Sequence, residues 1–493
     1  MKWSEPQKNT NWRKSIPYII MSTLSSATFW YLANDLSGEF GFLMWIAPIP
    51  MLLLSLKFPV RVSFFASFMA FFIGKLSWYT YLVPMLSIKF TLIYFTISSA
   101  IFAGIVLLFQ QFSLKVPKWY SVFVFPILYT VLEFLLLKFA PDGSAGSIAY
   151  SQMNYLPVVQ IASVTGILGI TFHLCLVASA LALCLYHYKE RPIFSKILST
   201  ALLCSLMVFV YGFIRLSPKI EEGPKITAAM AVLEEKYHHI TKQPDTLQEW
   251  QTARAYADIA NDLAQKGAKI VLLPERALNI TKDNENDILA LFSETSRSNK
   301  ICMVIGYTNY RSDTPRNSAL VIGTNGKISS QYNKSRLINI LEDEFVPDDR
   351  PGIFQHEGLP MGTAICKDLD FPDYIKRYKD IHLLAVPAWD FVVDGWLHSR
   401  MALLRSIENG FSQIRAARQG LLSANDRLGR IVSEVSCSDK TRASLLVEVP
   451  LSKESTLYAR FGDWFGLLNC VVLVILLFLF LYRKNKEKSG GRL

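Results

Sequence analysis

Three polar residues in the middle of the sequence follow short apolar runs, and their side chains are those that acyl transfer requires. They are Glu275, Lys334 and Cys366. A cysteine thiolate is a nucleophile, a carboxylate takes a thiol proton, and an ammonium stabilises the negative charge that develops on a carbonyl oxygen. Ligand sites in α/β proteins assemble where strands end. The sequence therefore predicts acyl-enzyme chemistry, with Cys366 as nucleophile, Glu275 as base and Lys334 as stabilising cation.

Each of these residues also has a simpler interpretation when it is taken alone. An isolated lysine is usually a solvated surface group, and a cysteine in an apolar strand is usually a small core residue. The seven cysteines show no CxxC pair, and no two histidines have the spacing of a helical zinc site. We therefore predict neither a metal nor a cofactor. A Cys302–Cys437 disulfide is conceivable, but two unpaired core residues are the favoured interpretation.

The segment that carries these residues alternates strand-like and helix-like patterns, which favours a layered α/β domain. Asn325-Gly326 between two β-rich runs is a strong hairpin signal, and a second hairpin is predicted around Leu428-Gly429. The predicted strands are 226–232, 269–273, 301–307, 318–323, 327–332, 361–366 and 381–386, and the predicted helices are 247–266, 283–300 and 396–409.

The remainder of the chain is dominated by long apolar runs. Hydrophobic residues make up 51% of the 493 residues, and a membrane-spanning helix needs about 20 of them in succession. About seven candidate spans precede the α/β domain, at 15–33, 39–57, 61–83, 90–112, 120–138, 164–187 and 194–215. We predict an N-terminal membrane domain at 1–216, the α/β domain at 222–456, an eighth helix at 465–483 and a basic tail at 484–493. The first apolar run is long, so we interpret it as a retained helix and not as a signal peptide.

Lysine and arginine are concentrated in alternate joints between the predicted spans. They precede the first span and fill the C-terminal tail, so the positive-inside rule places both termini in the cytoplasm. An odd number of spans then places 222–456 outside the cytoplasm. These flanks also account for most of the net charge of +11. The α/β domain has no basic stripe, so no nucleic-acid partner is expected.

Three sequence blocks around these residues resemble the signature blocks of the nitrilase, or carbon–nitrogen hydrolase, superfamily. The blocks are Pro274-Glu275, Tyr332-Asn333-Lys334-Ser335-Arg336-Leu337 and Cys366-Lys367-Asp368-Leu369-Asp370-Phe371-Pro372. The resemblance implies a Glu–Lys–Cys triad on an α-β-β-α sandwich. Arg405-Ser406-Ile407-Glu408-Asn409-Gly410 is similar to a further motif of that family and makes Glu408 a supporting residue.

The same superfamily places a second glutamate eight residues after the lysine, where it orients the lysine or assists the base. The spacing favours Glu342, whereas Phe345-Val346-Pro347 aligns better with Glu344, so both remain candidates.

The order of membrane spans and α/β domain resembles that of the apolipoprotein N-acyltransferases. Ala149-Tyr150-Ser151-Gln152, Pro157 and Gly166-Ile167-Leu168-Gly169 are similar to a loop and helix start in that family. The resemblance implies transfer of an acyl chain from a phospholipid to the N-terminal amine of a diacylglyceryl-cysteine lipoprotein, in a bacterial inner membrane. The expected route is ping-pong, through a thioester on Cys366.

Two segments depart from the pattern of that family. Cys366-Lys367-Asp368 stands where Cys-Tyr-Glu or Cys-Tyr-Asp is usual, and Pro141-Asp142-Gly143-Ser144-Ala145-Gly146 replaces a Phe-Pro-Trp motif. Lys367 either adds positive potential near the thiolate or points away from it, as alternate residues of a strand do. Candidates to line an acyl groove are Trp389, Phe391 and Trp396, for which core packing is an equal alternative.

Two other functions remain open on sequence grounds. The same triad would serve a membrane-bound carbon–nitrogen hydrolase (an amidase), or an acyltransferase that acts on another amine. A non-catalytic scaffold or transporter is the third possibility, although transport sites usually require charged residues within the spans. Only Lys75 and Glu133 are of that kind, and Glu133 is expected to face the bundle interior or a polar cavity.

Overall fold

The computed structural model describes residues 15–115, 119–217, 223–238, 244–437, 442–451 and 453–490. The predicted cytoplasmic residues 1–14, and 491–493 of the predicted tail, lie outside the described residues. The chain forms two compact units. The helical unit comprises Met1–Ala140, Gly146–Ile214 and Asp463–Leu493, and the sandwich unit comprises Pro141–Ala145 and Arg215–Gly462.

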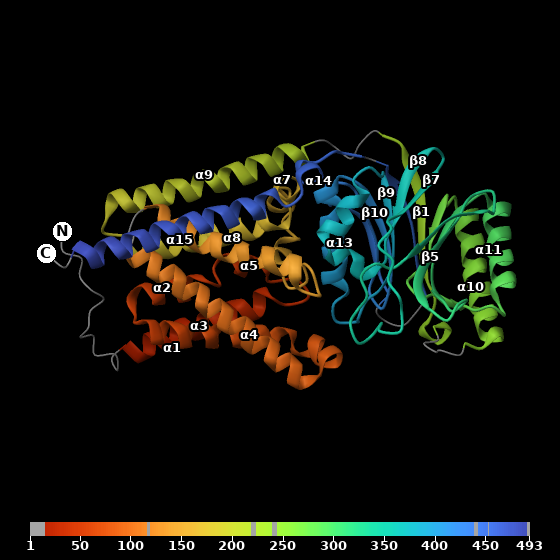
Figure 1. The fold of residues 1–493 in the computed structure, drawn as a ribbon. Helices are drawn as coiled ribbons and strands as arrows, with labels where there is room; N and C mark the ends of the chain where they lie inside the picture. The colour runs from red at the N-terminus through yellow and green to blue at the C-terminus, as the bar shows by residue number, and fades with distance from the viewer. Residues whose placement is uncertain are drawn as a thin grey trace. The chain divides into compact units, whose positions relative to one another are not determined.

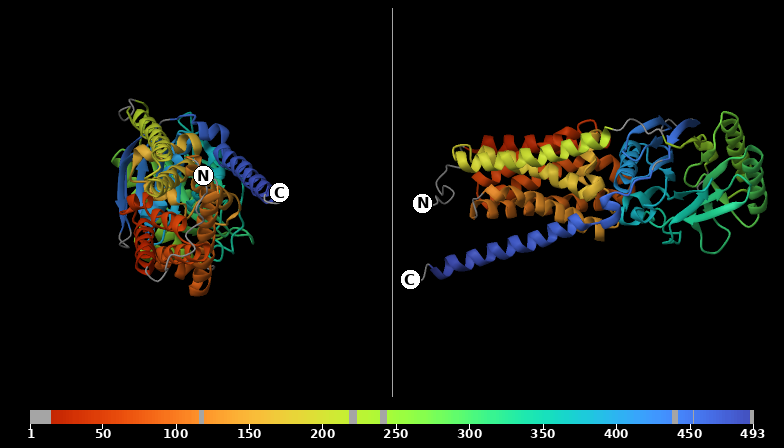
Figure 2. Two further views of the ribbon diagram at one scale, coloured as in Figure 1. Left: turned by 90° about the vertical axis from the view of Figure 1, so that its left-hand side faces the viewer. Right: turned by 90° about the horizontal axis from the view of Figure 1, so that it is seen from above.

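The helical unit consists of apolar helices whose axes point in roughly the same direction (Figures 1 and 2). Its α-helices are α1 (Ile16–Ala33), α2 (Ile49–Lys57), α3 (Val60–Lys75), α4 (Tyr79–Lys115), α5 (Val124–Phe139), α6 (Leu156–Val159), α7 (Ala162–Thr165), α8 (Ile167–Tyr186), α9 (Arg191–Leu216) and α15 (Trp464–Gly490). Short 3-10 turns join several of them, namely η2 (Gly41–Trp45), η3 (Leu76–Trp78), η4 (Trp119–Phe123) and η5 (Ile148–Gln152).

Within the described part of the chain, five helical segments are long and apolar enough to cross a membrane. They are Val60–Lys115, Trp119–Phe139, Ile167–Tyr186, Arg191–Leu216 and Trp464–Leu481. The first is 56 residues long and contains two predicted spans, which meet at a kink where Ser87 has φ 66°. The apolar helix Gly41–Lys57 is shorter. The membrane character is therefore supported, while the count of eight spans stays a prediction.

The two charged residues predicted within spans are both buried in the helical unit, Lys75 at 4% and Glu133 at 6% exposure. The Glu133 carboxylate accepts hydrogen bonds from Ser147 Oγ (2.8 Å) and Ile148 N (2.9 Å), and also from the Thr171 hydroxyl. Glu133 thus faces the interior, as predicted. Its contacts hold the beginning of η5.

The sandwich unit contains two mixed β-sheets. The first has the strand order β13-β1-β2-β4-β5-β6, with β3 paired to β4, and the second has the order β12-β11-β10-β9-β8-β7. The strands are β1 (Lys225–Val232), β2 (Ile270–Leu272), β3 (Leu278–Ile280), β4 (Cys302–Asn309), β5 (Arg316–Ile322), β6 (Ile328–Asn333), β7 (Gly352–His356), β8 (Leu359–Thr363), β9 (Leu383–Trp389), β10 (Ser412–Arg418), β11 (Leu421–Asn425), β12 (Ile431–Ser436) and β13 (Ala443–Pro450).

Helices cover the outer faces of both sheets. Helices α10 (Thr246–Gln265) and α11 (Glu285–Asn299) lie on the first sheet, and α13 (Gly395–Asn409) lies on the second (Figure 1). The short elements η6 (Glu235–Tyr237), η7 (Cys366–Asp370), α12 (Pro372–Ile375), η8 (Lys376–Tyr378) and α14 (Leu457–Phe461) complete the unit. The predicted α-β-β-α sandwich is confirmed.

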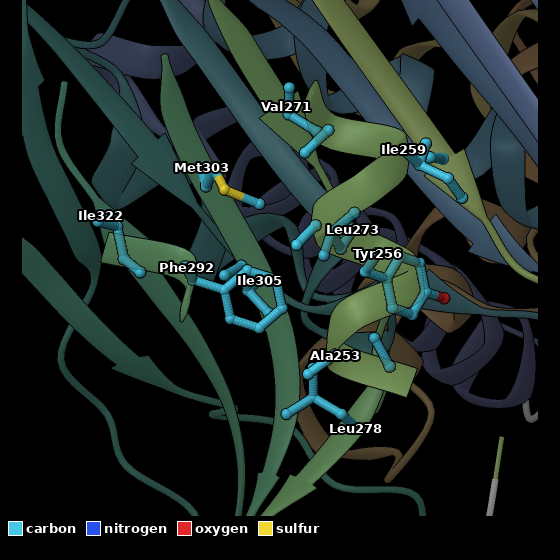
Figure 3. Close-up of a cluster of buried hydrophobic side chains, with 14 of the residues drawn as sticks. Ala253, Tyr256, Ile259, Val271, Leu273, Leu278, Phe292, Met303, Ile305 and Ile322 are labelled. Atoms are coloured by element: carbon cyan, nitrogen blue, oxygen red, sulfur yellow. The ribbon is translucent and has the colours of Figure 1, made fainter. Parts of the chain in front are cut away.

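Apolar side chains fill the layers between these elements. Tyr256 of α10 and Phe292 of α11 pack with Met303 and Ile305 of β4 in the cluster drawn in Figure 3. A second cluster lies between the two sheets and includes Cys302 and Cys437. Both cysteines are free and buried, so the favoured interpretation of two unpaired core residues is confirmed.

Candidate active site

Lys334 follows β6 directly, and its ammonium lies between two buried carboxylates. Its Nζ donates to Glu275 Oε1 (2.7 Å) and to Glu342 Oε2 (2.8 Å), and the lysine residue is 1% exposed. Burial alone would lower the pKa of Lys334, but the two carboxylates hold that pKa well above its usual value. The site therefore contains a permanent cation fixed by two anions.

Glu342, and not Glu344, is the second glutamate that contacts the lysine. The Glu342 carboxylate also accepts from Ile338 N (2.8 Å), whereas the Glu344 carboxylate pairs with Arg276 at 3.9 Å. Burial opposes ionisation of Glu342, yet Lys334 lowers its pKa below the usual value. The structure thus separates the two candidates that the sequence left open.

Asn317 of β5 completes this cluster, and the sequence analysis missed it. Its Nδ2 donates to Glu275 Oε1 (2.6 Å) and to Glu342 Oε1 (2.7 Å), and its backbone carbonyl oxygen accepts from Lys334 N (2.8 Å). One amide therefore orients both carboxylates around the lysine. In the sequence, Asn317 is one of three polar residues, with Arg316 and Ser318, that begin this strand, and no local pattern distinguishes it from the other two.

Cys366 begins the 3-10 turn η7 and does not end a strand as predicted. Strand β8 stops at Thr363, and Cys366 has φ 43°, a left-handed conformation that is strained for a non-glycine residue. Its Sγ donates to the carbonyl oxygen of Trp389 (3.6 Å). Burial, and then the Glu275 carboxylate, raise the pKa of the thiol well above its usual value, and Lys334 opposes them. The candidate nucleophile is therefore a neutral thiol, which would need a base to react.

Asp368 ties the lysine segment to the cysteine turn. Its carboxylate accepts from the backbone N–H groups of Ile365 (2.8 Å), Ser335 (3.0 Å) and Arg336 (2.8 Å), and from the Tyr332 hydroxyl (2.6 Å). Buried carboxylates are stable when such donors satisfy them. This bridge accounts for the convergence of two blocks that lie about thirty residues apart in the sequence.

Comparison with known proteins covers both units. The family model described as carbon-nitrogen hydrolase matches residues 229–460, and the model described as the apolipoprotein N-acyltransferase N-terminal domain matches residues 26–180. The apolipoprotein N-acyltransferase of Thermotoga maritima is 22% identical over 500 residues, which cover 92% of each chain. The enzyme of that name from Geobacter metallireducens is 25% identical over 478 residues, 86% of this chain and 88% of that one. This chain belongs to the apolipoprotein N-acyltransferase family.

The two segments that depart from the pattern of the N-acyltransferase family contact each other. Lys367 Nζ pairs with Asp142 Oδ1 at 2.5 Å, and both residues belong to the sandwich unit. The Lys367 side chain is 9% exposed. Because Cys366 begins a 3-10 turn, the alternation of a strand does not apply to Lys367, and its ammonium is directed to Asp142.

The aromatic candidates have cationic neighbours. Trp389 is the last residue of β9 and not a residue beyond the strand, and its ring lies 4.0 Å from the Arg418 guanidinium and 5.7 Å from that of Arg276. The Trp396 ring lies 5.5 Å from Arg400, and Phe391 is half-buried. Their assignment to an acyl groove stays a prediction. Glu408 pairs with Arg405 at 3.1 Å inside α13, with both side chains fully buried, and its supporting role stays a prediction.

A second ionic cluster adjoins the nucleophile and was not predicted. Arg415 of β10 donates to both oxygens of Asp390 (2.8 and 2.5 Å), and His398 Nδ1 lies 3.5 Å from Asp390 and 3.6 Å from Asp394. Burial alone would lower the pKa of His398, but the carboxylates of Asp394 and Asp390 raise it to about 9. Asp390 directly follows Trp389, whose carbonyl oxygen accepts from Cys366. The ion pairs of Asp390 therefore fix the backbone segment that contacts the thiol.

The different contacts of Glu342 and Glu344 lead to a direct test. We expect Glu342→Gln to slow acylation of Cys366 about 10- to 100-fold, because hydrogen bonds to charged groups contribute about 1.5–3 kcal/mol. Glu344→Gln, the matched control, is expected to stay within about twofold of wild type because its cation is more distant. Single-turnover acylation followed by intact-protein mass measures both. Equal rates for the two variants would contradict the assignment.

Proposed function

We propose that this protein transfers an acyl chain from a membrane phospholipid to the N-terminal amine of a diacylglyceryl-cysteine lipoprotein. One observation carries the proposal: in a chain of the N-acyltransferase family, Glu275 and Glu342 hold the buried Lys334, and Asp368 ties the residues after that lysine to the turn that Cys366 begins. The catalytic triad is Glu275, Lys334 and Cys366. Glu342 and Asn317 position the lysine and the base.

In the first half-reaction, the Cys366 thiol gives its proton to Glu275 while Sγ attacks the ester carbonyl carbon of the phospholipid. The Lys334 ammonium stabilises the oxyanion of the tetrahedral intermediate. The carbon–oxygen bond to glycerol then breaks, and the departing alkoxide takes the proton from Glu275. The products are a thioester on Cys366 and a neutral lysophospholipid hydroxyl, so atoms and charges balance.

In the second half-reaction, the lipoprotein amine attacks the thioester carbonyl and loses its proton to Glu275. The carbon–sulfur bond breaks, and the sulfur recovers the proton as a thiol. An amine attacks a thioester faster than water does at equal concentration, but water is abundant and would hydrolyse the thioester if it could enter the site. Burial of Cys366, which is 8% exposed, favours transfer over hydrolysis by limiting water.

The membrane helices supply the second part of the proposal. A phospholipid donor and a lipid-anchored acceptor both reside at a membrane surface, and an enzyme held there meets them at a high effective concentration. We place the protein in a bacterial inner membrane with both termini in the cytoplasm and the sandwich unit outside. The distribution of lysine and arginine supports this orientation.

The test supplies the purified full-length protein with a phospholipid that carries a fluorescent acyl chain and a diacylated lipopeptide. The expected product is the lipopeptide with one added acyl chain, together with lysophospholipid in equal amount. Release of free fatty acid with no acylated lipopeptide would instead assign an ester or amide hydrolase. Acylation of a simple amine, but not of the lipopeptide, would assign another acceptor.

A further inference from the structure

The short segment Pro141–Ala145 is a part of the sandwich unit although it lies between membrane helices in the sequence. Ser144 donates twice to the carbonyl oxygen of Asp370, from its backbone N and from its Oγ, both at 2.7 Å. Asp142 pairs with Lys367 at 2.5 Å. Both partners belong to the 3-10 turn that Cys366 begins. Three polar contacts therefore connect one five-residue segment to the turn of the nucleophile.

Gly143, at the centre of this segment, allows the close approach. Its φ is 54°, and a Cβ at this position would lie 2.5 Å from the carbonyl oxygen of Asp370. Any side chain would therefore push the segment away from the turn. The close contact between the segment and the turn therefore depends on glycine, both for its positive φ and for its lack of a side chain.

The nucleophile turn needs such support because its first residue is strained. A left-handed non-glycine conformation persists only where surrounding contacts fix it. Asp368, the middle residue of the turn, is held by the backbone N–H groups of Ile365, Ser335 and Arg336, which donate to its carboxylate. Within the described residues, Asp142 pairs with the Lys367 side chain, and Ser144 donates to the Asp370 carbonyl.

We propose that Asp142 and Ser144 are positioning residues for Cys366, and that Asp142 acts through Lys367. They hold the turn at its second residue, Lys367, and at its last residue, Asp370, and so keep the thiol directed into the site. The segment that replaces the usual family motif thus takes part in acylation without touching the reacting atoms. This inference deepens the proposed function and rests on it for the acyl donor, but the clamp itself is tested separately below.

The experiment compares full-length wild type in detergent with Ser144→Ala plus Asp142→Asn, which removes two contacts but keeps Gly143. We expect thioester formation from the fluorescent phospholipid to slow about tenfold, the value for losing roughly one hydrogen bond and one ion pair. Asp262→Asn is the matched control, because Asp262 forms an exposed pair with Lys266 on α10 (3.7 Å). It is expected to keep the wild-type rate.

A second measurement separates positioning from general stability. Iodoacetamide labelling of Cys366 is followed against pH, with buried Cys302 in β4 as the internal reference. In the double variant, the relaxed turn exposes the thiol, so Cys366 labelling shifts to lower pH while Cys302 stays unlabelled. Faster labelling together with slower acylation is the signature of a lost clamp. Labelling of Cys302 as well would assign the contacts to fold stability and overturn the inference.

The role of Asp142 through Lys367 is tested by a double-mutant cycle. If Asp142 acts through Lys367, then Asp142→Asn has no further effect on acylation in a Lys367→Met background. Additive effects would overturn the inference that Asp142 acts through Lys367. Wild-type acylation and labelling in the Ser144→Ala plus Asp142→Asn protein would overturn the whole inference. If wild type itself forms no thioester, the proposed function fails, while the labelling profiles still decide whether the clamp exists.

Discussion

Replacement of Cys366 by alanine is expected to abolish both thioester formation and lipopeptide acylation, with a loss of at least about a thousandfold. Removal of a covalent nucleophile typically costs this much or more, because the remaining groups only bind and polarise the substrate. The side chain is small and buried, and its hydrogen bond to the Trp389 carbonyl is long (3.6 Å). The fold should therefore survive the change. Intact-protein mass reports the thioester, and lipopeptide mass reports transfer.

The matched control is Cys302→Ala, which removes another buried and free cysteine of the same unit. Its activity should equal that of wild type. Wild-type Cys366 should also react with iodoacetamide increasingly as pH rises beyond the usual thiol range, because burial and Glu275 raise its pKa. A Cys366→Ala protein that retains a tenth of wild-type acyl transfer would show that the nucleophile lies elsewhere.

The candidate reacting groups could be proposed from the sequence because their chemistry is local. A carboxylate, an ammonium and a thiol that each follow an apolar run are visible without any tertiary information. The sandwich layers were also visible, since alternating strand and helix patterns extend through the unit. Strand β13 was missed because it pairs with β1, Ala443 opposite Val232, and no local pattern encodes a partner two hundred residues away.

The residues that position these groups were not predicted, for a related reason. Asn317 contacts Glu275 and Glu342 only after β5 pairs with β4 on one side and with β6 on the other. The direction of Lys367 depends on the 3-10 turn, whereas a strand had been expected at that point. Arg415 meets Asp390 because β10 lies parallel to β9. Single polar residues within buried strands are therefore the part of an active site that depends most on tertiary pairing.

Replacement of Lys334 by methionine is expected to destabilise the sandwich unit by about 3–5 kcal/mol, the usual cost of removing one partner from a buried ionic cluster. The substitution leaves Glu275 and Glu342 facing each other with side chains only 4% and 5% exposed. One of them must then take up a proton or draw in water. Acylation should also be lost, since no cation remains to stabilise the oxyanion. Thermal unfolding of the full-length protein in detergent measures the first effect.

Lys453→Met is the matched control, because Lys453 is 38% exposed and pairs with Asp380 at 3.5 Å. Such surface pairs contribute about 0–1 kcal/mol, so its melting temperature should stay close to that of wild type. Adding Glu342→Gln to Lys334→Met should recover part of the lost stability by removing one of the two unpaired charges. If the double variant is less stable than Lys334→Met alone, repulsion between the carboxylates is not the cause. The lysine would then contribute chiefly by packing, and its role in the site would rest on acylation rates alone.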